Sequence, residues 1–130
     1  MSLPSVESLI EKLAQALTPY FTSQSQPVIV GIETGGAWIA ERLQKRIAPE
    51  AEFGRLNISF YRDDFTRTGL HPTVRPSSLP TNIDDRTIIL VDDVLQSGRT
   101  VRAAMNELFD YGRPRRILLA ILIDRGEREI

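Results

Sequence analysis

The sequence predicts an α/β fold, a mostly parallel sheet flanked by helices, in a single domain that covers residues 1–130. Two apolar runs, residues 88–91 and 117–123, contain no polar residue, which is typical of strands buried on both faces. Stretches with helical spacing of apolar residues alternate with the predicted strands. This alternation favours parallel strands joined by helices that cover both faces of the sheet.

The first half of the chain contains two predicted helices and one strand. Apolar residues recur at helical intervals over residues 6–17, which predicts a packing helix that Thr18-Pro19 ends. Residues 27–32 are apolar apart from one glycine and predict a strand. Helical spacing resumes over residues 39–47. Residues 33–36 are therefore expected to form a loop between a strand and a helix.

The second half adds a strand, a long loop and a further helix and strand. Alternating apolar residues predict a strand over residues 55–61. Residues 62–80 are polar and interrupted by proline, and a loop of this length in a compact domain is usually a lid or disordered. Helical spacing over residues 101–109 and the apolar run 117–123 complete the pattern, which ends at Asp124-Arg125-Gly126.

Composition excludes several classes of protein. A formal net charge of −1 provides no overall basic field for nucleic acid, although a local patch stays open. The absence of cysteine excludes disulfides and thiolate metal sites and agrees with a cytoplasmic location. His71 is the single histidine and has no partners for a zinc site or a Ser-His-Asp triad. No apolar run is long enough to span a membrane, so no membrane partner is expected.

The motif that begins at Asp92 is the strongest functional signal. The carboxylates of Asp92 and Asp93, expected at the end of the strand, can accept hydrogen bonds from sugar hydroxyls or help to hold Mg²⁺. The turn of residues 97–100 then opens a helix, where backbone N–H groups and hydroxyls favour a phosphate. A phosphate cradle beside a hydroxyl site suits a sugar phosphate. The alternative is a solvated acidic pair followed by an ordinary turn.

Two further segments point to an anionic ligand. The loop of Glu33, Thr34, Gly35 and Gly36 also joins a strand to a helix, and its glycines expose backbone N–H groups. Arginines in the long loop carry positive charge suited to a diphosphate, and Arg62 is preferred because it lies nearest the predicted strand end. Ligands of parallel sheets collect at the carboxyl ends of the strands, where these loops are expected.

The segment 88–100 resembles the signature of type I phosphoribosyltransferases, which bind 5-phosphoribosyl-1-diphosphate (PRPP). The resemblance implies a Rossmann-like fold with a flexible lid loop, and Asp92, Asp93 and Arg62 as catalytic residues. It implies Mg²⁺ as the cofactor, held mainly through PRPP and with Asp92 and Asp93 as further ligands. The loop 33–36 would bind the diphosphate. The residues implied around the ribose and the 5-phosphate are Asp92, Asp93, Val94, Leu95, Gln96, Ser97, Gly98, Arg99 and Thr100.

More of the chain resembles the PyrR family, bifunctional pyrimidine-operon regulators with uracil phosphoribosyltransferase activity. The matching stretches are residues 60–64, 91–95, 98–104, 111–114, 123–126 and 128–129. The resemblance implies conversion of uracil and PRPP to UMP and diphosphate, with Ile123, Asp124 and Arg125 on the base side. It also implies a homodimer or higher homo-oligomer, and pyrimidine-operon mRNA as a further partner.

Three departures from the PyrR pattern keep alternatives open. Many PyrR proteins have Thr-Arg-Gly where this chain has Thr34-Gly35-Gly36, so one charge is missing from the diphosphate loop. Family members continue past Asp124-Arg125-Gly126, which leaves open a truncated chain with impaired activity. The first predicted helix has Lys12 as its one basic residue, which weakens the RNA-binding half of the resemblance.

The alternatives are therefore a non-catalytic RNA-binding attenuator that senses UMP or UTP, and a phosphoribosyltransferase for another nucleobase. For the attenuator, dimerisation would gather Arg113, Arg115 and Arg116 into one basic face. A receiver domain is disfavoured. In such a domain the acidic pair would follow the first strand and a lysine would come further on, whereas here the pair comes later and no lysine follows it.

Overall fold

The computed structural model describes residues 5–22, 25–58, 77–80, 82–95 and 98–124. Its centre is a four-stranded sheet in the order β2-β1-β3-β4, in which every neighbouring pair is parallel. The strands are β1 (Val28–Ile32), β2 (Phe53–Leu56), β3 (Thr87–Leu95) and β4 (Arg116–Asp124). The parallel sheet expected from the apolar runs is confirmed.

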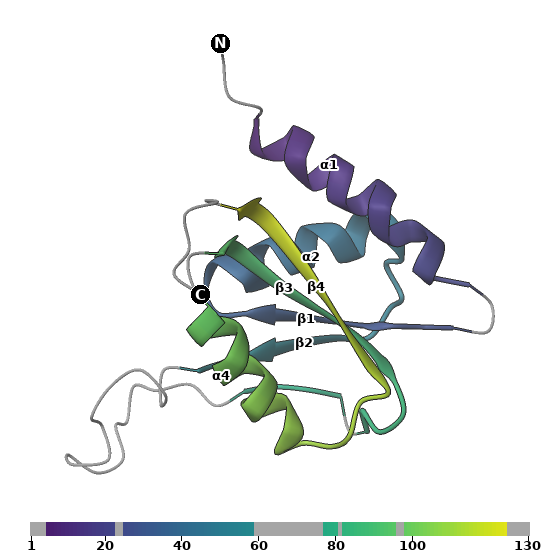
Figure 1. The fold of residues 1–130 in the computed structure, drawn as a ribbon. Helices are drawn as coiled ribbons and strands as arrows, with labels where there is room; N and C mark the ends of the chain where they lie inside the picture. Colours follow the sequence, from purple (N-terminus) through teal and green to yellow (C-terminus); the bar gives the residue numbers. More distant parts are fainter. Residues whose placement is uncertain (1–4, 23–24, 59–76, 81, 96–97, 125–130) are drawn as a thin grey trace.

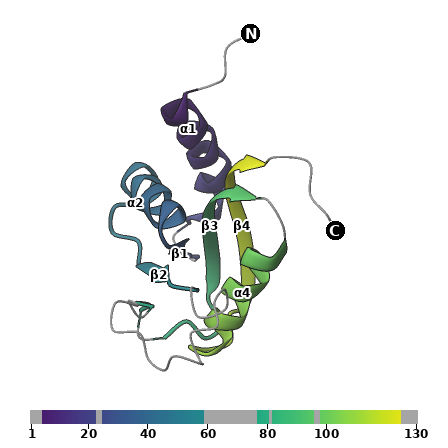
Figure 2. The same ribbon diagram turned by 90° about the vertical axis from the view of Figure 1, so that its left-hand side faces the viewer.

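Helices cover both faces of the sheet, as Figures 1 and 2 show. Helices α1 (Val6–Leu17) and α2 (Gly35–Ile47) lie on one face, and α4 (Gly98–Phe109) lies on the other. A short 3₁₀ turn, η1 (Thr18–Tyr20), follows α1. In the described part of the chain, no helix combines the length and the apolar character needed to cross a membrane.

Two separate cores result from the alternation of side chains along the central strands. Ile29, Ile89 and Val91 pack with α1 and α2. On the opposite face of the sheet, Val30 and Leu90 pack with α4. Strands β1 and β3 are thus buried on both faces, which explains why their sequences are almost uninterrupted apolar runs.

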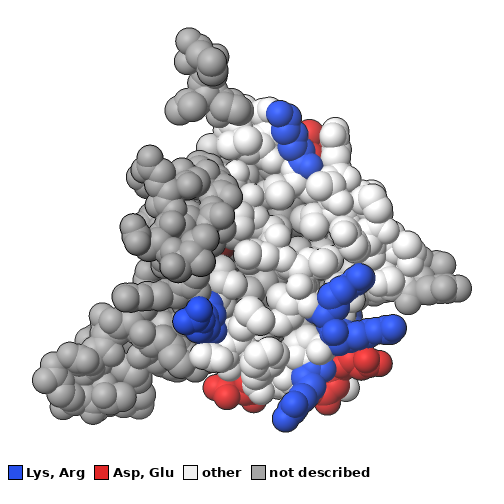
Figure 3. Space-filling view, viewed as in Figure 1, with Lys and Arg blue, Asp and Glu red and all other residues white. Residues whose placement is uncertain are grey.

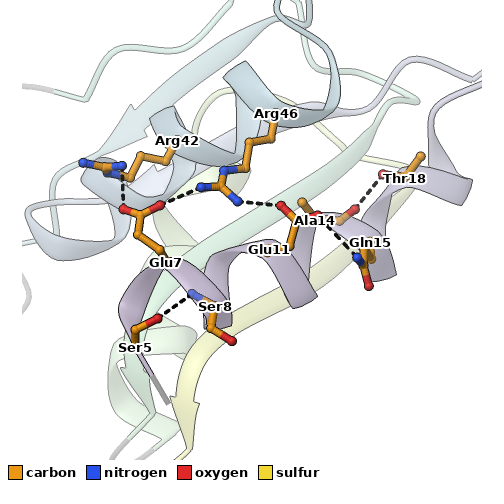
Figure 4. A network of polar contacts seen from close by, with 9 residues as sticks. All are labelled: Ser5, Glu7, Ser8, Glu11, Ala14, Gln15, Thr18, Arg42 and Arg46. Atoms are coloured by element: carbon orange, nitrogen blue, oxygen red, sulfur yellow. Dashed lines mark hydrogen bonds and ion pairs between the residues drawn. The ribbon is translucent and has the colours of Figure 1, made fainter. Parts of the chain in front are cut away.

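Helix α1 is fixed to α2 by an apolar stripe and by ion pairs. Ile10, Ala14 and Leu17 are buried in the core on that face of the sheet. Glu7 binds both Arg42 and Arg46 of α2, and Glu11 binds Arg46, as Figure 4 shows. All these charged side chains are at least one-third exposed. The apolar contacts therefore contribute most of the docking free energy, since exposed ion pairs contribute about 0.2–1 kcal/mol each.

Two predicted boundaries differ from the structure. The strand expected over residues 55–61 is β2, Phe53–Leu56; it pairs with β1 and ends at Leu56, opposite the last residue of β1, Ile32. Residues 59–61 of the predicted strand lie outside the described residues. Strand β3 continues through Asp92 and Asp93 to Leu95, so the acids lie within the strand. Past Val91, β3 has left β1 but still pairs with β4, which lengthens it.

The end of the predicted long loop is described and is attached to the sheet. Arg55 and Ser78 form an isolated antiparallel bridge, with backbone hydrogen bonds of 2.7 and 2.9 Å. The N–H of Asn57 donates to Oγ of Ser77 (2.9 Å), and the Ser77 hydroxyl donates to Oε2 of Glu107 on α4 (2.8 Å). These bonds attach residues 77–78 to β2, to Asn57 and to α4. Residues 62–76 of the predicted lid lie outside the described part.

Candidate functional site

The carboxyl ends of β1 and β3 bring two of the predicted loops together. These strands are neighbours in the sheet, paired from Val28 opposite Ile88 to Gly31 opposite Val91. The segments that follow both strands consequently leave the sheet at the same edge. Glu33 and Thr34 connect β1 to α2, and their peptide bond is cis. Asp92 and Asp93 lie on the adjoining strand at the same level.

Glycines allow these two segments to touch. A Cβ added at Gly35 would lie 2.6 Å from Cγ of Asp93, and one at Gly36 would lie 3.0 Å from Cα of Asp92. Both distances are shorter than an ordinary van der Waals contact, so a side chain at either position would displace β3 atoms. The sequence interpretation gave these glycines the role of exposing N–H groups; the structure adds close packing of the loop against the acidic pair.

Gly31 in β1 is a further residue of this site that the sequence interpretation missed. A Cβ at Gly31 would collide with Cα of Ala37 and lie 2.7 Å from the carbonyl oxygen of Gly36. The absence of a side chain thus lets α2 begin directly above the end of β1. The available signal was a glycine inside an otherwise apolar strand, which marks close approach of another backbone.

The two aspartates occupy different environments. Asp92 is 6% exposed, and its Oδ1 accepts a hydrogen bond of 2.9 Å from the backbone N–H of Asp93. Asp93 is half-buried and lies against Gly35. Because successive side chains of a strand point to opposite faces, the two carboxylates leave β3 on different sides. A single ligand would therefore contact them from different directions.

The helices that open at this edge present unpaired backbone donors. Thr34 is the N-cap of α2, and its side chain makes no capping hydrogen bond. Helix α4 begins at Gly98, so Thr100 lies in its first turn, as the predicted strand–turn–helix motif requires. The first N–H groups of a helix have no partner within the helix and favour anions. Along the chain, one of these helix starts precedes the acidic pair and the other follows it.

The other predicted site residues are placed in part. Val94 and Leu95 belong to β3, opposite Ile123 and Asp124 of β4, so the predicted base-side backbone reaches the same edge. Gly98 and Arg99 begin α4. The predicted residues that lie outside the described part are Arg62, Gln96, Ser97 and Arg125.

Magnesium is compatible with the described donors, although they do not form a complete cage. Among the residues that the structure describes, no group of three or more acidic or histidine side chains could hold a metal ion. Mg²⁺ is commonly bound by one or two carboxylates together with substrate phosphates and water. Asp92 and Asp93 fit such a partial donor set.

Comparison with known proteins identifies the family. The family model described as "Phosphoribosyl transferase domain" matches residues 2–130. A hypoxanthine-guanine phosphoribosyltransferase structure from Bacillus anthracis superimposes with a TM-score of 0.73 at 23% identity, covering 100% of this chain and 77% of that one. A purine phosphoribosyltransferase from Pyrococcus horikoshii gives 0.69 at 23% identity, covering 96% and 76%. At this identity the two structures establish the fold of type I phosphoribosyltransferases.

Sequence relatives are closer. A "Bifunctional protein PyrR" of Pseudomonas paraeruginosa is 53% identical over 132 residues, covering 100% of this chain and 78% of the relative. The protein of the same name from Pseudomonas aeruginosa is 51% identical with the same coverage. The chain therefore belongs to the phosphoribosyltransferase family and, within it, to the PyrR proteins. The resemblance inferred from the sequence motifs is confirmed.

Proposed function

We propose that this protein is a uracil phosphoribosyltransferase, which converts uracil and PRPP to UMP and diphosphate. The observation that carries the proposal is the contact between the loop of Gly35 and Gly36 and the strand of Asp92 and Asp93. The segment proposed to bind the diphosphate then lies beside the strand proposed to bind the ribose, as a donor with both groups requires. Membership of the PyrR family supports the choice of uracil over a purine base.

The residues would divide the donor between them. The first turn of α4, from Gly98 to Thr100, would hold the 5-phosphate through backbone N–H groups. Asp92 and Asp93 would accept hydrogen bonds from the ribose hydroxyls. The start of α2, with the uncapped Thr34, would hold the diphosphate. This division orients C1 of the ribose between the diphosphate and the base.

In the reaction the bond from C1 to the diphosphate oxygen breaks and its electron pair leaves with the diphosphate, while N1 of uracil bonds to C1 and releases its proton to water. Positive charge develops on the ribose, and negative charge develops on the diphosphate. The N–H groups at the start of α2 stabilise the leaving group as that charge grows. Mg²⁺, when bound, neutralises part of the charge on PRPP. Ile123, Asp124, Arg125 and Arg62 are proposed to enclose the base and the diphosphate.

A turnover assay tests the proposal. The purified protein is incubated with PRPP, Mg²⁺ and each of uracil, hypoxanthine and guanine, and nucleotides are separated by chromatography. UMP formation that stops when EDTA is added is expected. Product from a purine base and none from uracil would contradict the choice of base. No product from any base would contradict the enzymatic function.

A second candidate is regulation of pyrimidine genes through RNA. The observation in favour is the word "bifunctional" in the names of the relatives. The form that binds RNA would be a homodimer in the cytoplasm. Trp38 on α2 is 47% exposed, and a second copy of the chain would cover it. Filter binding of a pyrimidine-leader RNA over a salt series tests this role, since affinity carried by phosphate contacts falls steeply with salt. Turnover without RNA retention would leave the enzyme alone.

A further inference from the structure

A pocket lies at the end of the sheet opposite the proposed donor site. Ser25, Thr87, Arg115 and Arg116 line it, and its volume is about 360 Å³. Thr87 and Arg116 begin β3 and β4 and are register partners, so the pocket lies where these strands start. From Thr87 to Asp92 is five residues along β3, or about 16 Å at ~3.3 Å per residue. The two regions are therefore distinct.

The arginines of the pocket lack a carboxylate partner. Arg42, Arg46 and Arg86 each form an ion pair with a glutamate. Within the described residues, no carboxylate lies at ion-pair distance from Arg115 or Arg116. Their positive charge is therefore uncompensated at short range. Two guanidinium groups that line one pocket attract an anion, and their planar donors match phosphate oxygens.

The surrounding groups favour the same ligand. The hydroxyls of Ser25 and Thr87 form no hydrogen bond to another described residue and can donate into the pocket. The Arg116 guanidinium lies 5.6 Å from the centroid of the Tyr20 ring, within the range of a cation–π contact. Figure 3 shows basic side chains grouped where β3 and β4 begin in Figure 1, with acidic ones beside them.

Two of the nearby acidic side chains, those of Glu52 and Asp84, are engaged by other groups. Glu52 pairs with Arg86 at 2.6 Å, and Oδ1 of Asp84 accepts a hydrogen bond of 2.7 Å from the backbone N–H of Arg113. Asp85 donates its backbone N–H to the Arg113 carbonyl oxygen. None of these three residues lines the pocket. The lining itself is cationic and hydroxylic.

We propose that this pocket binds the phosphate group of a nucleotide-sized ligand, separately from PRPP. Its volume lies at the low end of the range for small-molecule sites, which suits a mononucleotide. The proposal does not depend on the activity at the carboxyl edge of the sheet, because no residue is shared between the two sites.

NMR of arginine side chains tests the proposal on the full chain. The Nε–Hε signals of Arg115 and Arg116 are assigned with R115Q and R116Q, and UMP and inorganic phosphate are titrated at constant ionic strength. Saturable shifts of both signals are expected, and they should persist in D92N/D93N, where capture of PRPP is impaired. Shifts that grow linearly, or that equal those caused by sodium chloride, would overturn the proposal.

Affinity measurements on charge variants complete the test. In the D92N/D93N background, R115Q/R116Q is expected to weaken UMP binding by at least about tenfold, since each arginine supplies charge-assisted hydrogen bonds. The matched control K12Q/K45Q removes the same charge from exposed positions on α1 and α2 and should leave binding unchanged. Equal loss in both variants would show a general charge effect and refute the site. Saturation by a single-stranded RNA but not by UMP would refute a nucleotide-sized ligand.

Discussion

Gly35, in the first turn of α2, lies directly against the carboxylate of Asp93 in β3: a Cβ added to the glycine would be 2.6 Å from Cγ of the aspartate. The loop after β1 and the strand of the acidic pair are thus fitted to each other without any side chain between them. An arginine at position 35 would require another position for the Asp93 carboxylate.

Replacing Gly35 tests this contact. Gly35→Ala is expected to lower the free energy of unfolding by about 1–3 kcal/mol, because the new methyl group overlaps the Asp93 side chain. Capture of PRPP should weaken as well, since the carboxylate must move. Chemical denaturation and a PRPP titration measure the two effects. In the Asp93→Ala background most of the overlapping atoms are absent, so the penalty should fall. An unchanged penalty would show that the contact does not exist.

Gly36→Ala should behave differently from Gly35→Ala. A Cβ at Gly36 meets the carbonyl oxygen of Val91 and Cα of Asp92, both of which are backbone atoms. No side-chain rotation can relieve that overlap, so a loss of at least about 1–3 kcal/mol is expected and no truncation in β3 should rescue it. Thermal unfolding of the variant, alone and combined with Asp93→Ala, measures the difference. Rescue by Asp93→Ala would contradict the placement of Gly36.

Ser77 is expected to stabilise the junction of β2, the segment after residue 76 and α4. Its hydroxyl links the N–H of Asn57 to the buried carboxylate of Glu107, which is 5% exposed. Ser77→Ala should cost about 1–3 kcal/mol, because two hydrogen bonds are lost and one of them is to a carboxylate. Urea denaturation checks the value. Ser78→Ala is the matched control, since the exposed Ser78 bonds to Arg55 through its backbone; equal effects of the two variants would refute the link.

The docking of α1 should depend on packing far more than on charge. Ile10→Ala is expected to lower stability by about 2–5 kcal/mol, because Ile10 is fully buried. Glu7→Gln should cost about 0.2–1 kcal/mol, and less at high salt, because its partners Arg42 and Arg46 are exposed to solvent. Unfolding at low and high ionic strength separates the two terms. A larger loss of stability from Glu7→Gln than from Ile10→Ala would show that charge contributes more than packing.

Sequence periodicity was sufficient for the parallel sheet, the three long helices and the edge at which the loops meet. It was not sufficient for the ends of the strands. Strand β3 continues past Val91 because β4 is still beside it, and β2 stops at Leu56 because β1 has ended. Both boundaries depend on a neighbouring strand, which local residue patterns do not contain.

The site, like the fold, was predictable from the sequence only in part. The acidic pair and the two phosphate-type loops follow from residue type and order. The packing of Gly31, Gly35 and Gly36 depends on distances between segments far apart in the sequence. The burial of Glu107 had one local indication in the sequence: it stands beside Leu108 among the apolar residues that α4 buries. Its partner Ser77 could not have been found from the sequence.

Calorimetric titration of PRPP with Mg²⁺ into the wild-type protein and into D92N/D93N tests the central claim most directly. The control E50Q/D110N removes two exposed carboxylates far from the acidic pair in sequence. If the acidic pair binds the ribose, D92N/D93N folds cooperatively but binds PRPP at least about tenfold more weakly, and the control binds like the wild type. Wild-type affinity in a folded D92N/D93N protein would show that the acidic pair does not bind PRPP.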